Sequence, residues 1–572
     1  MQEKSVSEKP VEGESFNSFP IDYEKGKTKY IIITGSVMSG VGKGTFSSCL
    51  GTLLSCHDFK ISPLKFDGYL NCDAGTLNPY RHGEVFVLDD GTECDLDLGT
   101  YERQLNMNLS KDNYLTAGKI FKIIIDKERD GKYLGRDVQF IPHVTGEIKY
   151  FLRNLAVKSS ADIVLVEVGG TVGDLENSYF IEAVRELRYE EGKENVCFIN
   201  VTYILEPKSL GEFKSKPAQL GIRKLMELGV QPDIIVCRSE KPIDKKIKEK
   251  VSIFSDVDVN RIYNLWDFGN IYEIPLLLRE NKIDEAIFDI LKLKPNANTE
   301  LNFSKWKDLV DKLRKADKEV TIGIIGKYTY VHDSYLSIIK ALEHVAPYLG
   351  AKVKIKWIES TDIEDGNVKV EGSLKDVDGL IIPGGFGKRG IEGKIDAIRY
   401  ARENKIPFLG LCLGMQLAVI EFARNVCGLS EANSTEFADT KQPVIDFIPE
   451  QINIVNKSKY GGTMRLGTYP AILKDGTIIK KLYNADKILE RHRHRYEVNP
   501  KYIEVLEKNG LIFSGKSPDG ILMEFIELKN HLFFVATQSH PEFKSRPMNP
   551  SSLFIGLVKA SLERKYDGTG VI

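Results

Sequence analysis

The sequence lacks several features that would assign the protein to a class at once. No run of 18 apolar residues occurs, so a membrane-spanning helix is not predicted. The 79 basic and 81 acidic residues leave a net charge of -2, which gives no indication of nucleic-acid binding. None of the eight cysteines is part of a Cys-x-x-Cys pair, which argues against structural zinc or disulfides. We therefore expect a protein of a reducing compartment, the cytoplasm, with neither nucleic-acid nor membrane partners.

Segment 1–27 is polar and charged, without the continuous apolar stretch of a secretory signal or the Arg-rich amphipathy of a transit peptide. We expect it to be a disordered tail. The remaining length exceeds what one hydrophobic core serves, so two domains of roughly 250 residues each are expected. We place them at 28–292 and 319–566, with a linker at 293–318 and a C-terminal tail at 567–572.

Apolar runs of strand length recur in both halves and alternate with stretches of helical periodicity. In the first half they lie at 30–34, 163–168, 195–201 and 234–237. In the second half they lie at 320–325, 353–358, 380–382 and 408–411. Regular alternation of strand and helix indicates parallel sheets covered by helices on both faces. The predicted fold class is therefore α/β, with two doubly wound parallel-sheet domains.

A cysteine flanked by glycines marks the second half, where Gly-Leu-Cys-Leu-Gly at 410–414 follows one apolar strand and opens a helix predicted over 414–423. The glycines permit a sharp turn, and the helix N-terminus favours a thiolate at Cys412. His540 follows another apolar strand, at 532–536, and Glu542 comes two residues later. A lone cysteine and a lone histidine are usually structural. The spacing here instead favours a nucleophile, a base and an orienting carboxylate.

With the glycine-rich strand end Pro-Gly-Gly-Phe-Gly at 383–387, this pattern resembles the class I, triad-type glutamine amidotransferases, which release ammonia from glutamine. The resemblance implies that Cys412 is the nucleophile, His540 the base and Glu542 its orienting residue, with the Leu413 N–H in the oxyanion hole. It also implies a set of glutamine-binding residues: Gly385, Leu413, Gly414, Met415, Gln416, Glu436 and Arg495. Apart from the resemblance, segment 491–495 would be a solvated basic stretch, which stays open for Arg491 and Arg493.

A phosphate-binding loop is predicted near the other end, where the strand at 30–34 runs into Gly-Ser-Val-Met-Ser-Gly-Val-Gly-Lys-Gly-Thr at 35–45 and then into a helix. The standard spacing is not met, because Val37 takes the first glycine position and Gly44 separates Lys43 from Thr45. Exposed N–H groups, the helix N-terminus and the Lys43 charge still suit a phosphate. The alternative is a glycine-rich loop that only packs a helix on a sheet.

Further along the chain, acidic residues suit a metal ion at the phosphates, and basic residues suit a second phosphorylated ligand. Asp97 and Glu167, the latter inside an apolar strand, could bring Mg2+ to the phosphates, because Mg2+ prefers one or two carboxylates plus phosphate oxygens. The lysine-rich segment at 211–219 suits a second phosphorylated ligand.

Together these elements resemble the CTP synthase family over about residues 28–565. Its most specific stretches lie at 65–71, 82–87, 95–99, 167–174 and 461–467. The resemblance implies ATP-binding residues: Gly40, Val41, Gly42, Lys43, Gly44, Thr45, Lys65, Asp97, Trp266, Asp267 and Phe268. It implies UTP- and CTP-binding residues: Ser39, Asp174, Leu175, Glu176, Lys214, Ser215, Lys216, Pro217, Ala218, Gln219 and Lys250. Asp97 and Glu167 would hold Mg2+.

The activity implied by the resemblance is ATP-dependent amination of UTP to CTP, with ammonia from glutamine, through UTP phosphorylated on its 4-oxygen. Ammonia would travel between the two sites by an internal path. The resemblance further implies GTP as an allosteric activator, feedback inhibition by CTP, and a homotetramer that stacks into filaments.

Three positions depart from the family pattern: Gly68 replaces a proline, Ala218 a threonine, and Ser539 an aromatic residue. None removes a charged or nucleophilic group. Two alternatives remain: an ATP- and glutamine-dependent amidase of the cobyrinic acid type, and a non-catalytic, filament-forming paralogue. The Lys-x-Lys-Pro-x-Gln segment at 214–219 argues against the first, and the intact Cys412, His540 and Lys43 argue against the second.

Overall fold

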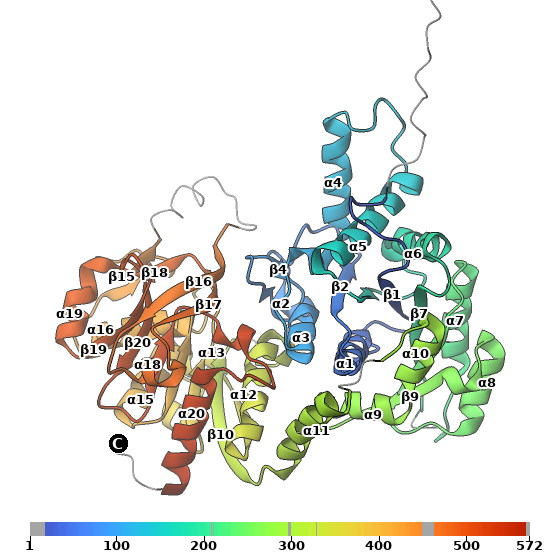
Figure 1. Ribbon diagram of the computed structural model, residues 1–572. Coiled ribbons are helices and arrows are strands. Elements are labelled where there is room, and N and C mark those ends of the chain that lie inside the picture. Colours follow the sequence, from blue (N-terminus) through green and yellow to red (C-terminus); the bar gives the residue numbers. More distant parts are fainter. Residues whose placement is uncertain are drawn as a thin grey trace, which may run out of the picture.

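The computed structural model describes residues 18–207, 209, 211–295, 299–327, 329–448 and 463–567. The chain forms two α/β bodies, one coloured blue to green and the other yellow to red, connected by helix α11 (Thr299–Lys315) (Figure 1). Within these ranges, no helix is both long and apolar enough to cross a membrane.

The first body is built on a seven-stranded sheet in the order β5-β2-β6-β1-β7-β8-β9, and all its neighbouring strands run parallel. Its strands are β1 (Lys29–Gly35), β2 (Ile61–Asp67), β5 (Tyr114–Thr116), β6 (Ile163–Val168), β7 (Val196–Tyr203), β8 (Ile234–Ser239) and β9 (Ile262–Trp266). The four strands expected from the sequence correspond to β1, β6, β7 and β8. A small hairpin of β3 (Phe86–Val87) and β4 (Glu93–Cys94) lies beside it.

Helices cover both faces of this sheet. Ile31 and Ile33 of β1 contribute to the core under one face, whereas Tyr30 and Ile32 contribute to the core under the other. This alternation follows from the two-residue period of a strand, and it explains why β1 is apolar throughout. The helices are α1 (Lys43–Cys56), α2 (Pro79–His82), α3 (Leu96–Leu105), α4 (Ala117–Arg129), α5 (Thr145–Ser159), α6 (Ser178–Glu191), α7 (Lys216–Glu227), α8 (Lys245–Ser255), α9 (Ile274–Glu280) and α10 (Ile283–Leu291).

The second body contains a nine-stranded mixed sheet in the order β11-β10-β12-β13-β21-β20-β19-β16-β17. The strands expected from the sequence form its parallel part: β10 (Lys318–Gly326), β11 (Ala351–Glu359), β12 (Gly379–Ile382), β13 (Phe408–Leu411) and β21 (Phe534–Thr537). The antiparallel part was not expected: β16 (Arg465–Leu473), β17 (Lys487–His494), β19 (Leu511–Lys516) and β20 (Met523–Leu528). The α/β class is confirmed, and the parallel description holds for about half of this second sheet.

Two helical layers enclose the second sheet, and a smaller sheet of β14 (Ala432–Ser434), β15 (Gln442–Phe447) and β18 (Tyr496–Val498) lies beside it. One apolar core takes residues from α15 and α16, and the other from α12 and α20. The helices are α12 (Leu336–Leu349), α13 (Ser360–Glu364), α14 (Val370–Leu374), α15 (Ile391–Glu403), α16 (Leu413–Asn425), α18 (Ile478–Tyr483), α19 (Ile503–Lys508) and α20 (Ser552–Leu562).

Helix α11 lies within the segment expected to be a linker. Its Trp306 is buried, and the indole N–H donates to the carbonyl of Tyr272 in the first body at 2.8 Å. The Tyr272 hydroxyl lies 2.6 Å from Nε2 of His344 on α12. The connection between the bodies is therefore packed and hydrogen-bonded rather than an extended linker, whereas the exact domain limits stay predictions.

Part of the expected N-terminal tail also differs from the prediction. Ser18 is buried, and its hydroxyl and carbonyl both accept hydrogen bonds from Arg153 of α5, at 2.8 and 3.2 Å. The Arg153 guanidinium lies 3.9 Å from the centre of the Phe19 ring. Disorder is therefore wrong for residues 18–27, because this cation anchors the segment; residues 1–17 lie outside the described ranges.

Candidate active sites

Cys412 occupies a strained turn between β13 and α16, with φ 50° and ψ -100°. Its peptide N–H donates to the carbonyl of Thr537 at 2.7 Å, which fixes the turn to the neighbouring strand. A Cβ on Gly410 would lie 2.9 Å from Cβ of Ala536, and one on Gly414 would lie 2.2 Å from the carbonyl oxygen of Ile382. Side chains have no room at either position, so the two glycines are needed for the nucleophile elbow.

His540 and Glu542 complete a triad with this cysteine. Nδ1 of His540 lies 2.7 Å from Oε1 of Glu542, and both side chains are buried. Burial disfavours the imidazolium, but the charges of Glu542 and Cys412 outweigh it and raise the pKa of His540 to about 10. At neutral pH His540 is therefore protonated, so an imidazolium lies beside the proposed nucleophile.

A cavity of about 320 Å³ opens beside the triad, and both bodies line it. Cys412, His540, Glu542 and Gly385 come from the second body, whereas Pro79, Glu84 and Val85 come from the first. A Cβ on Gly384 would lie 2.7 Å from Cε1 of His540, so the glycine loop keeps the space before the imidazole open. A product released from Cys412 therefore enters a space that residues of the first body also line.

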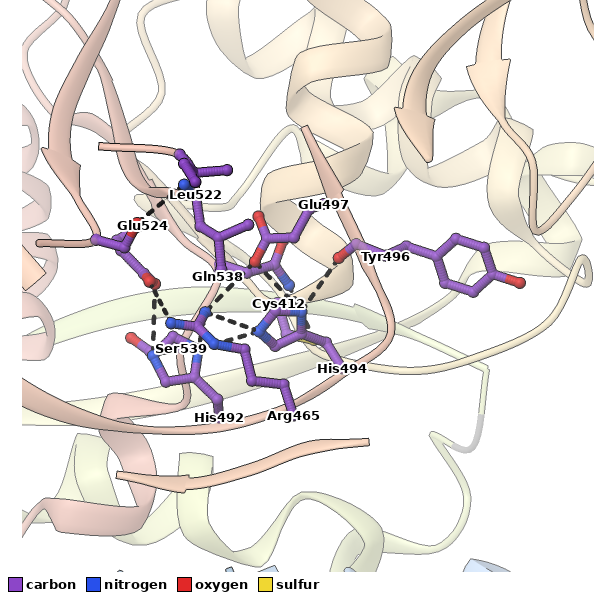
Figure 2. A network of polar contacts seen from close by, with 12 residues as sticks. Cys412, Arg465, His492, His494, Tyr496, Glu497, Leu522, Glu524, Gln538 and Ser539 are labelled. Atoms are coloured by element: carbon purple, nitrogen blue, oxygen red, sulfur yellow. Dashed lines mark hydrogen bonds and ion pairs between the residues drawn. The ribbon is translucent and has the colours of Figure 1, made fainter. Parts of the chain in front are cut away.

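Behind Cys412 lies a buried polar network (Figure 2). The Arg465 guanidinium contacts Glu524 at 2.7 Å, Glu497 at 3.4 Å, and the rings of His492 and His494 at 3.4 Å each. Burial, followed by the Arg465 charge, holds the pKa values of both histidines well below their usual range. Two neutral rings and one cation thus surround the carboxylates, an arrangement that fixes the strand behind the nucleophile.

The predicted glutamine-binding residues surround the elbow. Gln416, one turn into α16, donates to the carbonyl of Tyr496 at 3.1 Å and to Oε1 of Gln538 at 3.3 Å. Glu436 accepts the N–H of Gly387 at 2.7 Å, which places it at the glycine loop. Arg495 donates to the Thr463 hydroxyl at 2.9 Å. Leu413, Gly414 and Met415 form the first turn of α16, and of the family-specific stretch at 461–467, residues 461 and 462 lie outside the described ranges.

Two predictions about the basic stretch need correction. Arg491 is completely buried, and Arg493 pairs with Glu93 of the first body at 2.8 Å, so neither belongs to a solvated basic surface.

One residue of the site was not predicted from the sequence: Lys394, which lines the cavity at 1% exposure. Burial, together with the Lys327 charge, lowers the pKa of Lys394 to about 7. Its position three residues into α15 gave no sequence signal.

In the first body, the predicted phosphate loop joins β1 to α1. Val37, Gly40 and Gly42 all have positive φ, at 80°, 71° and 90°. Ser39, Gly40 and Val41 lie in the loop, and Lys43, Gly44 and Thr45 form the first turn of α1. The Lys43 ammonium donates to the carbonyl of Gly170 at 2.7 Å, and burial lowers its pKa. A helix N-terminus and a lysine thus face the carboxyl end of the sheet, as a phosphate site requires.

Asp97 and Glu167 converge beside this loop. Lys65 from β2 pairs with both carboxylates, at 2.9 Å from Glu167 and also in contact with Asp97. A Cβ on Gly44 would lie 2.7 Å from Asp97 and 3.5 Å from Glu167, so the glycine brings the helix start against both. Within the described chain, no group of three or more His, Cys, Asp or Glu side chains forms a ready-made metal cage. Two carboxylates beside a phosphate loop fit Mg2+, which prefers one or two protein ligands.

The predicted UTP- and CTP-binding residues at 214–219 span the start of α7. Lys214 and Ser215 precede this helix, and Lys216 and Pro217 are its first two residues. A Cβ on Gly221 of α7 would lie 2.6 Å from Cβ of Ser36, so the helix packs on the phosphate loop. Gln219 donates to the Ser215 hydroxyl at 3.0 Å, and Lys250 is exposed on α8. Ala218 is fully buried in the apolar core with Ile204 and Ile222, so its methyl group packs into the fold.

Two further groups frame this edge. Arg238 lies 3.1 Å from the Cβ position of Gly42 and pairs with Asp267 at 2.7 Å, and the rings of Trp266 and Phe268 lie 5.0 Å apart. Asp174 accepts the N–H of Thr171 at 2.7 Å, and Leu175 is exposed. A Cβ on Gly68 would lie 2.8 Å from Cβ of Glu176. Glycine at this departure from the family pattern therefore permits a close contact between two loops.

Comparisons with known proteins match both halves of the chain. Residues 29–293 match the family model described as CTP synthase N-terminus, and residues 330–560 match glutamine amidotransferase class-I. The CTP synthase of Thermococcus gammatolerans is 52% identical over 95% of this chain and 100% of its own length. That of Methanococcus maripaludis is 52% identical over 94% and 100%. Among solved structures, the glutaminase domain of Trypanosoma brucei CTPS with bound acivicin is 37% identical to this chain. The match covers 43% of this chain and 94% of that chain, and its TM-score is 0.40.

Fold, triad and phosphate loop define a glutamine-dependent, ATP-using ligase, in which a class I amidotransferase domain follows a synthetase domain. The identity to these two relatives extends over nearly the whole chain. The chain belongs to the CTP synthase family.

Proposed function

We propose that the chain aminates UTP to CTP with ATP and with ammonia that its second domain releases from glutamine, a step of pyrimidine nucleotide biosynthesis. The observation that carries the proposal is the cavity beside Cys412, which residues of both domains line. An amidotransferase that discharged ammonia into water would need no such shared wall, because ammonia is protonated in bulk solvent near neutral pH.

The triad accounts for the first half of the reaction. The Cys412 thiolate attacks the carboxamide carbon of glutamine, and the oxyanion is stabilised by the N–H of Leu413 and by the glycine loop at Gly385. His540 then donates its proton to the leaving ammonia, and Glu542 holds the imidazole through Nδ1. Gln416, Glu436 and Arg495 position the amino acid end of glutamine. Water resolves the thioester and releases glutamate.

The synthetase domain accounts for the second half. The N–H groups of the loop at 40–45 hold the phosphates of ATP, and Lys43 and Lys65 offset charge as the γ-phosphoryl group moves to the 4-oxygen of UTP. Asp97 and Glu167 would hold Mg2+, which neutralises charge on the phosphates when it is bound. Ammonia replaces the phosphate at C4, and CTP results. The lysines at 214 and 216 and at 250 offer cations to the UTP triphosphate.

The test supplies ATP, Mg2+ and an ammonium salt with UTP, and measures CTP and ADP. Equal amounts of both products support the proposal. ATP consumption only with a carboxylic acid as acceptor would indicate an amidase instead, and no turnover with any acceptor would indicate a non-catalytic paralogue.

We further propose a cytoplasmic homotetramer that stacks into filaments, activated by GTP and inhibited by CTP. Exposed apolar side chains around α4 and the loop after it support self-association through the first domain: Ile125, Leu134, Phe140 and Ile141. Light scattering with and without nucleotides gives the assembly, and glutamine-dependent rates with and without GTP give the activation. A monomer under all conditions, or rates unaffected by GTP, would contradict these proposals.

A further inference from the structure

Strand β17 supports the triad with its backbone. The carbonyl of Arg491 accepts the peptide N–H of His540 at 2.7 Å. The carbonyl oxygen of Arg493 lies 3.7 Å from Sγ of Cys412. The base and the nucleophile are therefore both positioned against the same three-residue stretch of one strand.

The side chains of the same two residues reach into the synthetase domain, as residues two apart on a strand point to one face. Arg491 donates from both terminal nitrogens to Glu102, at 2.8 and 3.0 Å, and from Nε to Asp89 at 2.6 Å. Arg493 donates to Glu93 at 2.8 Å. Arg491 and Glu102 are completely buried, so this bidentate pair is not screened by water.

Glu102 belongs to α3, whose first turn contains Asp97 of the proposed ATP and Mg2+ site. Glu102 follows Asp97 by five positions, so the two residues lie about 7.5 Å apart along the helix axis. Glu102 also accepts hydrogen bonds from Arg546 and from the N–H of Leu109, at 2.5 and 2.7 Å. A movement of α3 that did not carry Arg491 with it would break the buried bidentate pair with Glu102, which is disfavoured.

A second contact stiffens the same junction. The N–H and the hydroxyl of Thr468 on β16 donate to the carbonyl and the carboxylate of Asp89, at 3.0 and 2.8 Å. A Cβ on Gly467 would lie 2.7 Å from the backbone nitrogen of Gly91. The two backbones are in contact here, so β16, and β17 beside it, pack directly against the loop of the synthetase domain that contains Asp89 and Gly91.

We propose that Glu102 and Arg491 are positioning residues that make glutamine hydrolysis at Cys412 depend on nucleotide occupancy of the synthetase domain. Ligands at the Asp97 end of α3 set the position of Glu102, Arg491 transmits it to β17, and the carbonyls of β17 align His540 and Cys412. The inference rests on the proposed function, because it takes ATP and UTP as the ligands.

The experiment measures glutamate release with and without ATP, UTP and Mg2+, and separately CTP formation from an ammonium salt. Arg491→Lys keeps the positive charge but cannot form the bidentate pair. We expect ammonium-dependent CTP formation within about twofold of the native chain, whereas the nucleotide stimulation of glutamate release falls about tenfold. The loss should appear in kcat rather than in KM for glutamine, because neither residue contacts the substrate. Glu102→Gln is the second variant and should give the same pattern.

Arg188→Lys is the matched control, because Arg188 forms a bidentate pair with Asp233 at 2.8 and 2.9 Å inside the first domain, away from the triad. It should leave the stimulation unchanged. The inference is overturned if both test variants keep native stimulation, if glutamate release and ammonium-dependent activity fall equally, or if the native chain shows no stimulation. Failure of the proposed function is distinct, because the native chain would then form no CTP from ammonium.

Discussion

The side-chain amide of Gln538 donates a hydrogen bond to Sγ of Cys412 over 3.6 Å. Both residues are buried, and the same amide accepts a hydrogen bond from Gln416 at 3.3 Å. Gln538 thus links the nucleophile to a residue proposed to bind glutamine.

A hydrogen-bond donor to sulfur stabilises negative charge on it, so Gln538→Leu should make Cys412 a weaker nucleophile. We expect kcat/KM for glutamine hydrolysis to fall about 10- to 100-fold, the value of a hydrogen bond to a charged group. The rate of Cys412 alkylation by iodoacetamide measures the reactivity of the sulfur directly and should also fall. Ammonium-dependent CTP formation serves as the control for folding, and an unchanged alkylation rate would contradict this role.

Glu542 is the largest positive contribution to the basicity of His540, whose pKa is raised to about 10. Glu542→Gln removes that charge, so the imidazolium should lose its proton at lower pH. The alkaline limb of the pH profile of glutamine hydrolysis should therefore move down, towards about pH 6.5 to 7.5. Glu542→Asp should keep most of the native profile, and an alkaline limb that stays in place in the Gln variant would refute the assignment.

The buried Lys394 should make the stability of the folded chain depend on pH. Its pKa is about 7 in the folded chain against 10.5 in the unfolded chain, so the unfolded state binds more protons between these values. Stability from this group is lowest below about pH 7 and rises as the pH approaches 10.5, over a range on the order of 5 kcal/mol at most.

Lys394→Met removes this penalty and should raise the Tm at pH 6.5 by several degrees. The gain over the native chain should shrink at pH 9.5, where the native amine is neutral. Lys394→Arg keeps a charge at all pH values and should lower the Tm. Scanning calorimetry at both pH values measures these differences, and a Met variant no more stable than native at pH 6.5 would show that the ammonium has a stabilising partner.

Lys43 lies at the proposed phosphate site and far in sequence from the triad. Lys43→Met keeps the length of the side chain but loses the charge, so ATP-dependent amination should fall about 100-fold or more with either nitrogen donor. Basal glutamate release without nucleotides should stay within about twofold of native. Parallel assays of ADP and glutamate separate the two activities, and an equal loss of both would point to misfolding.

The local sequence pattern was sufficient to predict the candidate sites that lie at the carboxyl end of a strand. At Gly410, Gly414 and Gly44 other atoms occupy the space of a Cβ, whereas Gly40 and Gly42 have positive φ, and these glycines made both motifs visible. The central parallel strands, such as β1, β6 and β13, were visible because they are buried on both faces and so are largely apolar, whereas the edge strand β11 alternates apolar residues with lysines.

Pairings between distant residues could not be predicted in the same way. Strand β17 carries Arg and His at alternate positions, which in isolation suggests a solvated surface, yet Arg491 is buried because Glu102 of the other domain neutralises it. Burial of Lys394 likewise results from the packing of α15 against the cavity. The residues adjacent in sequence to Arg491 and Lys394 give no indication that these two side chains are buried.

The most direct measurement is UTP-to-CTP conversion with ATP and Mg2+, comparing glutamine with an ammonium salt for the native chain and for Cys412→Ala. The account predicts that the native chain uses both donors, and that the variant loses the glutamine-dependent reaction but keeps the ammonium-dependent one within about twofold. Glutamine-dependent CTP formation by Cys412→Ala, or no CTP from ammonium with either protein, would contradict the two-site account.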